Sequence, residues 1–171
     1  MNYIRHKSIE KCGFLCNNIL CNNIHSINIQ LGGNTIMIIK TKNGDILKGN
    51  EKRIAFAVNI EGENDEGFAG TISSRFWPEL AHIGETKLGT VLTKKVDDIE
   101  FFALCCHSWK EGWNNQEEVI KECFDAIPGD EPVASISIGT GLIGVFSGAN
   151  FNMIKAGMEA SKKEIILYSN P

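Results

Sequence analysis

Short apolar runs alternate with polar, glycine-bearing segments from about residue 35 onward, and this alternation predicts strands and helices in turn. Strands are predicted where β-branched and aromatic residues cluster between turn residues, at residues 35–41, 53–60, 133–138 and 164–168. Residues 89–106 predict two further strands around a turn at Asp97–Asp98. The Asn-Gly-Asp triplet at residues 43–45 predicts another turn.

Three segments have the spacing of helices. Residues 116–127 place Val119, Ile120, Cys123 and Phe124 at helical intervals, and Pro128–Gly129 ends the pattern. Residues 71–80 predict a short helix that stops near Pro78. Residues 151–160 predict a helix with four residues on one face, namely Met153, Ile154, Gly157 and Met158.

Strands that alternate with helices indicate an α/β fold in which helices cover a sheet. The chain has 171 residues, 43% of them hydrophobic, which suits one globular domain with a core of its own. Residues 1–34 differ from the rest because they are rich in Asn and Cys and show no sustained period. We therefore assign 1–34 to an N-terminal extension and 35–171 to the domain.

The charge balance narrows the classes of partner. The formal net charge is −4, with 17 basic and 21 acidic residues, so general nucleic-acid binding through a broad basic field is not expected. No apolar run approaches the ~20 residues that span a bilayer, and the N-terminus lacks the apolar region of a signal peptide. We expect no membrane partner and a reducing, cytoplasmic location.

The six cysteines fall into two groups. Cys105 and Cys106 lie in an apolar run, which is typical of small buried side chains, and Cys123 lies in a predicted helix. The N-terminal group forms a set whose ligand count is compatible with tetrahedral zinc: Cys12, Cys16, Cys21 and His25. Its spacing matches none of the common zinc motifs, and a small hydrophobic layer is the alternative, so no metal and no cofactor is expected.

The segment from Gly139 to Gly144 (GTGLIG) lies between a predicted strand and a predicted helix. Such a glycine-rich turn can direct backbone N–H groups and a helix N-terminus at phosphate oxygens. The segment fits the Rossmann pattern G-x-G-x-x-G, but only one helix and one strand follow it, and Glu164 opens that strand instead of closing it. A phosphate-binding loop of another α/β fold is favoured, and a turn without a ligand stays an alternative.

Three stretches together resemble a macro domain, the α/β/α fold that binds ADP-ribose. They are TKNGDILKG (41–49), AFAVNIEGENDEGFAG (55–70) and SIGTGLIGVF (137–146), and they occur in the order of that family. The resemblance implies a three-layer α/β/α fold with a central mixed sheet. It is nearest to the branch of terminal ADP-ribose glycohydrolases and ADP-ribose 1''-phosphate phosphatases.

The resemblance also implies the binding residues. Asp45 would accept a hydrogen bond from the adenine amino group, with Ile46 beside the base. A first loop would border the distal ribose and the diphosphate with Asn59, Gly67, Phe68 and Ala69. A second loop would wrap the diphosphate and place an aromatic ring near the distal ribose, through Gly139, Thr140, Gly141, Leu142, Ile143, Gly144, Val145 and Phe146.

Two departures from the branch bear on catalysis. Ile143 stands where the branch has an Asp, and His107 aligns near its nucleophilic Lys. The sequence therefore favours binding of ADP-ribose, or of an ADP-ribosylated macromolecule, over turnover. The alternatives are an ADP-ribosyl hydrolase or ADP-ribose 1''-phosphate phosphatase that uses His107 or Asp65, and a nucleotide sponge or interaction module with an altered ligand. His107 as a structural histidine and Asp65 as a solvated acid are the alternatives for those residues.

Overall fold

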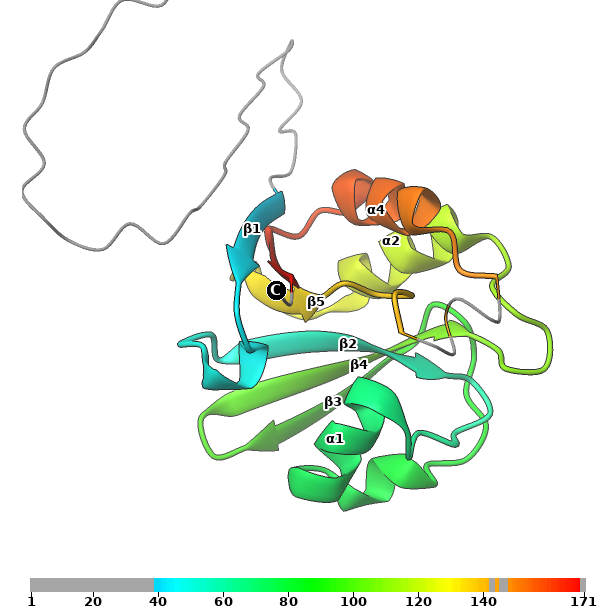
Figure 1. Ribbon diagram of the computed structural model, residues 1–171, viewed down its shortest axis with the longest axis horizontal. Coiled ribbons are helices and arrows are strands. Elements are labelled where there is room, and N and C mark those ends of the chain that lie inside the picture. The colour runs from blue at the N-terminus through cyan, green and yellow to red at the C-terminus, as the bar shows by residue number, and fades with distance from the viewer. Residues whose placement is uncertain (1–38, 142–143, 145–147, 170–171) are drawn as a thin grey trace, which may run out of the picture.

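A computed structural model describes residues 39–141, 144 and 148–169. Its described strands form one sheet in the order β1-β6-β5-β2-β4-β3 (Figure 1). Neighbouring strands are parallel except for β3, which pairs antiparallel with β4 at one edge. The strands are β1 (Ile39–Asn43), β2 (Arg53–Asn59), β3 (Val91–Val96), β4 (Ile99–His107), β5 (Val133–Ile136) and β6 (Ile165–Ser169).

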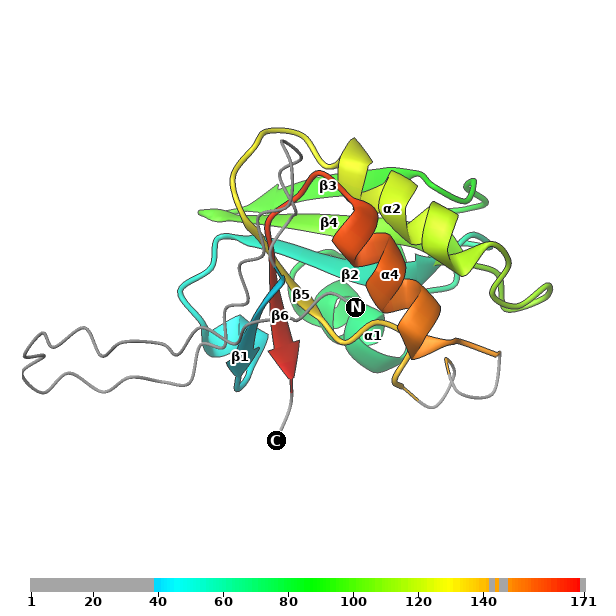
Figure 2. The same ribbon diagram turned by 90° about the horizontal axis from the view of Figure 1, so that it is seen from above.

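Helices cover both faces of this sheet. Helix α1 (Gly67–Arg75) lies on one face, and helices α2 (Gln116–Ala126) and α4 (Phe151–Ala160) lie side by side on the other (Figures 1 and 2). Two short 3-10 helices, η1 (Ile46–Lys48) and η2 (Pro78–Ala81), follow β1 and α1. The three-layer α/β/α arrangement with a mixed central sheet is therefore confirmed.

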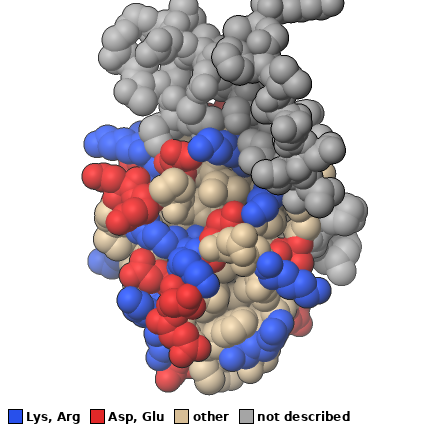
Figure 3. Space-filling model, turned by 90° about the vertical axis from the view of Figure 1, so that its left-hand side faces the viewer, with Lys and Arg blue, Asp and Glu red and all other residues tan. Residues whose placement is uncertain are grey.

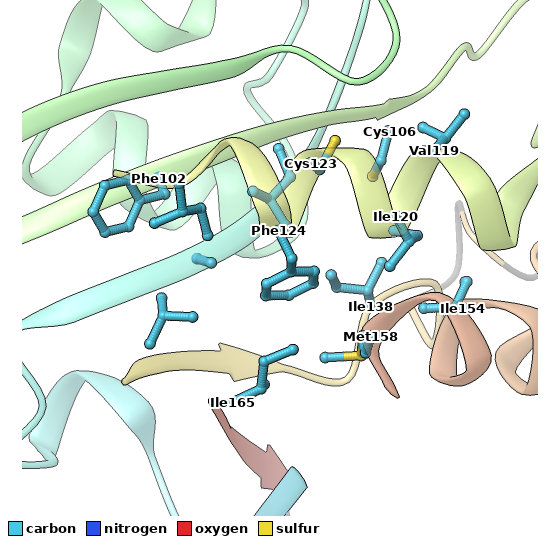
Figure 4. Close-up of a cluster of buried hydrophobic side chains, with 14 of the residues drawn as sticks. Phe102, Cys106, Val119, Ile120, Cys123, Phe124, Ile138, Ile154, Met158 and Ile165 are labelled. Atoms are coloured by element: carbon cyan, nitrogen blue, oxygen red, sulfur yellow. The ribbon is translucent and has the colours of Figure 1, made fainter. Parts of the chain in front are cut away.

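Strand β4 explains why the two faces have separate cores. Its side chains alternate between the faces, as expected for a strand buried on both sides. Phe102, Leu104 and Cys106 pack toward α2 and α4, in the cluster drawn in Figure 4. The intervening residues pack toward α1 and are likewise fully buried: Phe101, Ala103 and Cys105. The prediction that Cys105 and Cys106 are buried small side chains is confirmed.

A strand occurs at each predicted place, although residues 35–38 of the first predicted strand lie outside the described residues. Two helix predictions need correction. The helix predicted over 71–80 begins earlier, at Gly67, and ends at Arg75. Gly67 has φ 62°, so a glycine that looked like part of a loop starts the helix. Met153 was predicted on the apolar face of its helix, but its side chain is 40% exposed, and only Ile154, Gly157 and Met158 are buried there.

The outer edge formed by β1 has a mixed-charge surface. Figure 3 shows basic and acidic side chains intermingled on this side of the molecule. Lys40 pairs with Glu164, the residue before the neighbouring β6, and Lys42 Nζ lies 2.9 Å from Glu51 Oε1. Across the described ranges, every helix is too short or too polar to span a membrane.

Candidate functional site

Two adjoining cavities lie where β2, β4 and β5 end. Their volumes are about 320 and 740 Å³, and both are lined by Gly67, Phe68, Ile136 and Ser137. Parallel strands bring their carboxyl ends to one edge of a sheet, and ligands of open α/β sheets bind there. We call the smaller cavity, which also contacts His107, the inner cavity. The larger one contacts Asp45, where the sequence resemblance would place the adenine base, and we call it the base-side cavity.

Every described residue that the sequence placed in the site lines one of these cavities. The inner cavity contains Asn59, Asp65, Gly67, Phe68, Ala69, His107, Gly139, Gly141 and Gly144. The base-side cavity contains Asp45, Ile46, Gly67, Phe68 and Thr140. The predicted residues Leu142, Ile143, Val145 and Phe146 lie outside the described residues, as does the possible zinc set Cys12, Cys16, Cys21 and His25.

Asn59 shapes the first loop through its own side chain. It ends β2 at an irregularity in the pairing, which aligns it with His107 of β4. Its Oδ1 accepts a hydrogen bond from the Glu63 N–H at 3.1 Å, and its Nδ2 donates to the Glu63 carbonyl. The Asn59 N–H donates in turn to Asn64 Oδ1 at 3.0 Å. These hydrogen bonds of the Asn59 side chain stabilise the conformation of the loop, which is a structural role.

The start of α1 borders both cavities. The residue before it, Glu66, forms no side-chain cap, and Gly67 to Ala69 line the inner cavity. The first amides of a helix have no partner within the helix and attract anions. Gly70 keeps the loop close, because a Cβ at that position would lie 2.3 Å from the Asp65 carbonyl oxygen.

The second loop uses its glycines for different purposes. Gly139 has φ 75°, and an added Cβ would lie 2.7 Å from Ile154 Cδ1. At Gly144 a Cβ would lie 2.4 Å from the Gly139 carbonyl oxygen, so both positions need glycine for packing. Gly141 lines the inner cavity, and a Cβ there would meet nothing within 4 Å. A side chain at position 141 would therefore extend into space that a ligand would use.

His107, Trp109 and Trp113 form one wall of the inner cavity. The His107 ring stacks on Trp113 with centroids 4.7 Å apart, and its Nδ1 is buried without a hydrogen-bond partner. Burial lowers the pKa of His107 from 6.5 to about 4, although the nearby Glu61 carboxylate acts in the opposite direction. The imidazole is therefore neutral at pH 7. Trp109 is 50% exposed, whereas Trp113 is buried.

Glu61 fixes the segment that carries these tryptophans, and no sequence pattern indicated this role. Its carboxylate accepts hydrogen bonds from the Ser108 hydroxyl and, at 3.2 Å, from the Trp109 N–H. Burial alone would raise the pKa of Glu61, but these hydrogen bonds outweigh it and the pKa is lowered. A charged carboxylate thus holds the aromatic wall in place.

The base-side cavity adds residues that sequence reasoning missed, including Thr71, Arg75 and Tyr168. The Asp45 carboxylate accepts from the Leu47 N–H at 3.0 Å and lies 3.4 Å from Lys48 Nζ. Tyr168 donates its hydroxyl hydrogen to Glu51. Thr71 and Arg75 lie on α1 one helical turn apart. The helix predicted over 71–80 already placed them at this spacing, but no motif in the sequence marked them as site residues.

The described residues hold no cluster of His, Cys, Asp or Glu suited to a metal ion. What the site offers is a set of backbone amides, an apolar wall with aromatic rings, and carboxylates at the rim. Such an arrangement binds a ligand by shape and by hydrogen bonds to main-chain groups.

No family model matches the sequence, and no curated protein matches it. Solved structures do. A point mutant of the Oceanobacillus iheyensis macrodomain with ADPR is 16% identical, with a TM-score of 0.60, over 86% of this chain and 90% of that one. The macrodomain of Mycobacterium tuberculosis DarG is 14% identical, with a TM-score of 0.53, over 73% and 93%.

A structure described as alphavirus P23pro-zbd is 17% identical, with a TM-score of 0.55. It covers 80% of this chain, which spans only 22% of that longer protein. At these identities the likeness shows the fold, and it confirms at that level the resemblance found in the sequence.

Proposed function

We propose, on the premise that this chain has the macrodomain fold, that it binds ADP-ribose or a related adenine diphosphate nucleotide. The base would occupy the base-side cavity beside Asp45 and Ile46. The diphosphate would cross between the two loops, and the distal ribose would enter the inner cavity near Asn59.

One observation supports this assignment most directly. Gly67 at the start of α1 and Gly139 and Gly141 in the second loop, which have no side chains, border the same cavity. Two sets of main-chain N–H groups that converge on one space are suited to an anionic diphosphate. The ADPR complex of the Oceanobacillus iheyensis macrodomain has the same fold and is consistent with this use of it.

The acids of the first loop are the main opposing feature. Asp65 and Glu66 line the inner cavity and would repel a phosphate held close to them. Both side chains are exposed, so water screens their charges, while the α1 amides and the second loop act at short range. We therefore expect binding that becomes stronger when either acid is neutralised.

Hydrolysis of an ADP-ribosyl bond is the second candidate, because His107 and Asp65 line the same cavity. His107 is neutral above its pKa of about 4, so it could accept a proton from water but could not donate one as an imidazolium at pH 7. A base with so low a pKa is weak, which favours binding over fast turnover. The test is the rate at which ADP-ribose is released from a modified protein. If the His107→Ala and Asp65→Ala variants release it as fast as the wild type, both roles are excluded.

Calorimetry with ADP-ribose tests the proposal. We expect saturable binding of ADP-ribose, lower affinity for ADP and the lowest affinity for ribose 5-phosphate, because each smaller ligand lacks contacts with one part of the site. The absence of heat with ADP-ribose and with its phosphorylated relatives would contradict the proposal. Mass spectrometry of any nucleotide that copurifies with the protein would identify an altered ligand.

A further inference from the structure

The two cavities differ in the charged residues along their walls. The inner cavity is lined by Glu63, Asp65 and Glu66, and none of its described residues is a lysine or arginine. His107 adds no positive charge there at neutral pH, since burial keeps its imidazole unprotonated. Within the described ranges none of the three carboxylates has an ion-pair partner.

The base-side cavity has a cation that the fold itself does not use. Arg75, on the last turn of α1, is the one basic residue among its described lining. The one acid there is Asp45, which has its own ion-pair partner in Lys48 at 3.4 Å. The guanidinium lies 5.1 Å from the centroid of the Phe76 ring, and it pairs with no described carboxylate. The ring orients the guanidinium without neutralising its charge.

Three hydroxyl groups that line the same cavity as Arg75 already donate hydrogen bonds within the protein. Thr71 donates its hydroxyl hydrogen to the Gly67 carbonyl at 3.1 Å, and Thr140 donates to the Ser137 carbonyl at 2.7 Å. Ser169 donates to Asn43 Oδ1 at 2.7 Å. Arg75 therefore offers charged donors that no described carboxylate uses, and a guanidinium is the side chain best suited to phosphate.

We propose that this charge distribution selects adenine nucleotides with an additional phosphate on the adenosine side, as in 2'-phosphorylated ADP-ribose, and rejects those with a phosphate on the distal ribose. The inference rests on the proposed orientation, with the base beside Asp45. Arg75 would bind the 2'-phosphate, the role that an arginine has in many sites that distinguish phosphorylated from plain adenine dinucleotides. A 1''-phosphate would instead face the three carboxylates of the inner cavity.

The cavity sizes agree with this assignment. The base-side cavity has a volume of about 740 Å³, more than twice the 320 Å³ of the inner cavity. An extra phosphate therefore has room beside the adenosine, whereas the inner cavity is small and has backbone and aromatic walls on several sides. Space and charge favour the same end of the site.

Calorimetry with three ligands tests the proposal: ADP-ribose, ADP-ribose 2'-phosphate and ADP-ribose 1''-phosphate. We expect the 2'-phosphate to bind about two- to fivefold more tightly than ADP-ribose, the range of an exposed ion pair, and the 1''-phosphate to bind more weakly. Arg75→Gln should remove the preference for the 2'-phosphate, and Arg75→Lys should keep part of it. The double variant Asp65→Asn/Glu66→Gln should reduce the penalty on the 1''-phosphate.

Lys52→Gln is the matched control, because it also removes one positive charge but lies before β2 and pairs with Asp98, away from both cavities. It should leave the ratio of the two affinities as in the wild type. Equal affinities for ADP-ribose and its 2'-phosphate, or a preference that survives in Arg75→Gln, would overturn the proposal.

A second pair of probes separates this inference from the proposed function. Adenosine 2',5'-bisphosphate and AMP differ by the 2'-phosphate and need no distal ribose. If ADP-ribose fails to bind but the bisphosphate binds better than AMP in an Arg75-dependent way, the proposed function fails and the inference stands. If ADP-ribose binds and neither 2'-phosphate has an advantage, the inference alone fails. If none of these nucleotides binds, both are wrong.

Discussion

The imidazole of His107 stacks on the indole of Trp113, with 4.7 Å between ring centroids and 8° between ring planes. This contact closes the wall of the inner cavity and leaves the histidine Nδ1 buried without a partner. A protonated imidazole in that position would lose most of its hydration. The contact therefore makes His107 a neutral wall of the cavity and a source of acid sensitivity.

Acid should destabilise the protein through His107. Its pKa is lowered from 6.5 to about 4, so between these values the unfolded chain binds a proton that the native protein does not. Stability from this group is complete above pH 6.5 and is lost as the pH falls to 4, by roughly 2–3 kcal/mol. Urea unfolding from pH 7.5 to 4 measures it. The loss should be smaller in His107→Gln, and an identical pH dependence in both proteins would contradict the assignment.

Gly141→Val should weaken ligand binding without harming the fold. A side chain there meets no protein atom within 4 Å and extends into the inner cavity. We expect the affinity for ADP-ribose to fall about tenfold or more, in line with the cost of overfilling a packed space. The melting temperature should stay at the wild-type value. Gly144→Val is the contrasting variant, because its Cβ would collide with the Gly139 carbonyl oxygen, so affinity and melting temperature should fall together.

Gly157→Ala should destabilise the protein even though alanine is the better helix former. Helices α2 and α4 approach so closely there that a Cβ would lie 2.3 Å from the Glu117 carbonyl oxygen. We expect a loss of about 1–3 kcal/mol from the forced separation, after the gain of about 1 kcal/mol in helix propensity. Chemical denaturation measures it. Lys155→Ala, exposed on the same helix, should change stability by less than about 0.5 kcal/mol.

Tyr168→Phe should weaken the link between β6 and the segment before β2. The phenol donates to Glu51, which also pairs with Lys42, and its loss leaves one carboxylate oxygen short of a donor. We expect a cost of about 1–2 kcal/mol at pH 7.

The pKa of Tyr168 gives a second test of that contact. Burial and the hydrogen bond to Glu51 raise it, so stability is complete below the ordinary value of 10 and is lost as the pH rises above it. Denaturation between pH 8 and 11 should show this loss in the wild type and less of it in the Tyr168→Phe variant. Equal alkaline sensitivity in the two proteins would contradict the contact.

The sequence predicted the elements where burial left a strong pattern. Strands β2 and β4 are buried on both faces and appear as near-continuous apolar runs, and α2 shows helical spacing from Val119 to Phe124. Prediction from the sequence failed at the start of α1, where the helix begins at a glycine with positive φ and has no capping side chain. It also failed at Met153, because spacing alone does not show how wide the contact between two helices is.

The site could be predicted in part for a related reason. The glycines of both loops are visible as motifs, and their described members do line one pair of adjoining cavities. The contacts that fix the walls are not visible, because they join residues far apart in the chain. Glu61 binds Ser108 and Trp109 across 47 and 48 positions, and the order of strands that permits this has no local signal.

The two loops that border the cavities are anchored in different cores. The first loop continues into α1, whose Ala69 and Ile72 belong to the core on one face of the sheet. The second loop is flanked by Ile138 and the partly buried Ala149, which pack into the core on the other face. A nucleotide that contacts both loops would therefore connect two layers that lie on opposite faces of the sheet. Its binding energy would oppose the separate opening of either layer, so slower amide hydrogen exchange in α1 and in α4 together would be the sign of an occupied site.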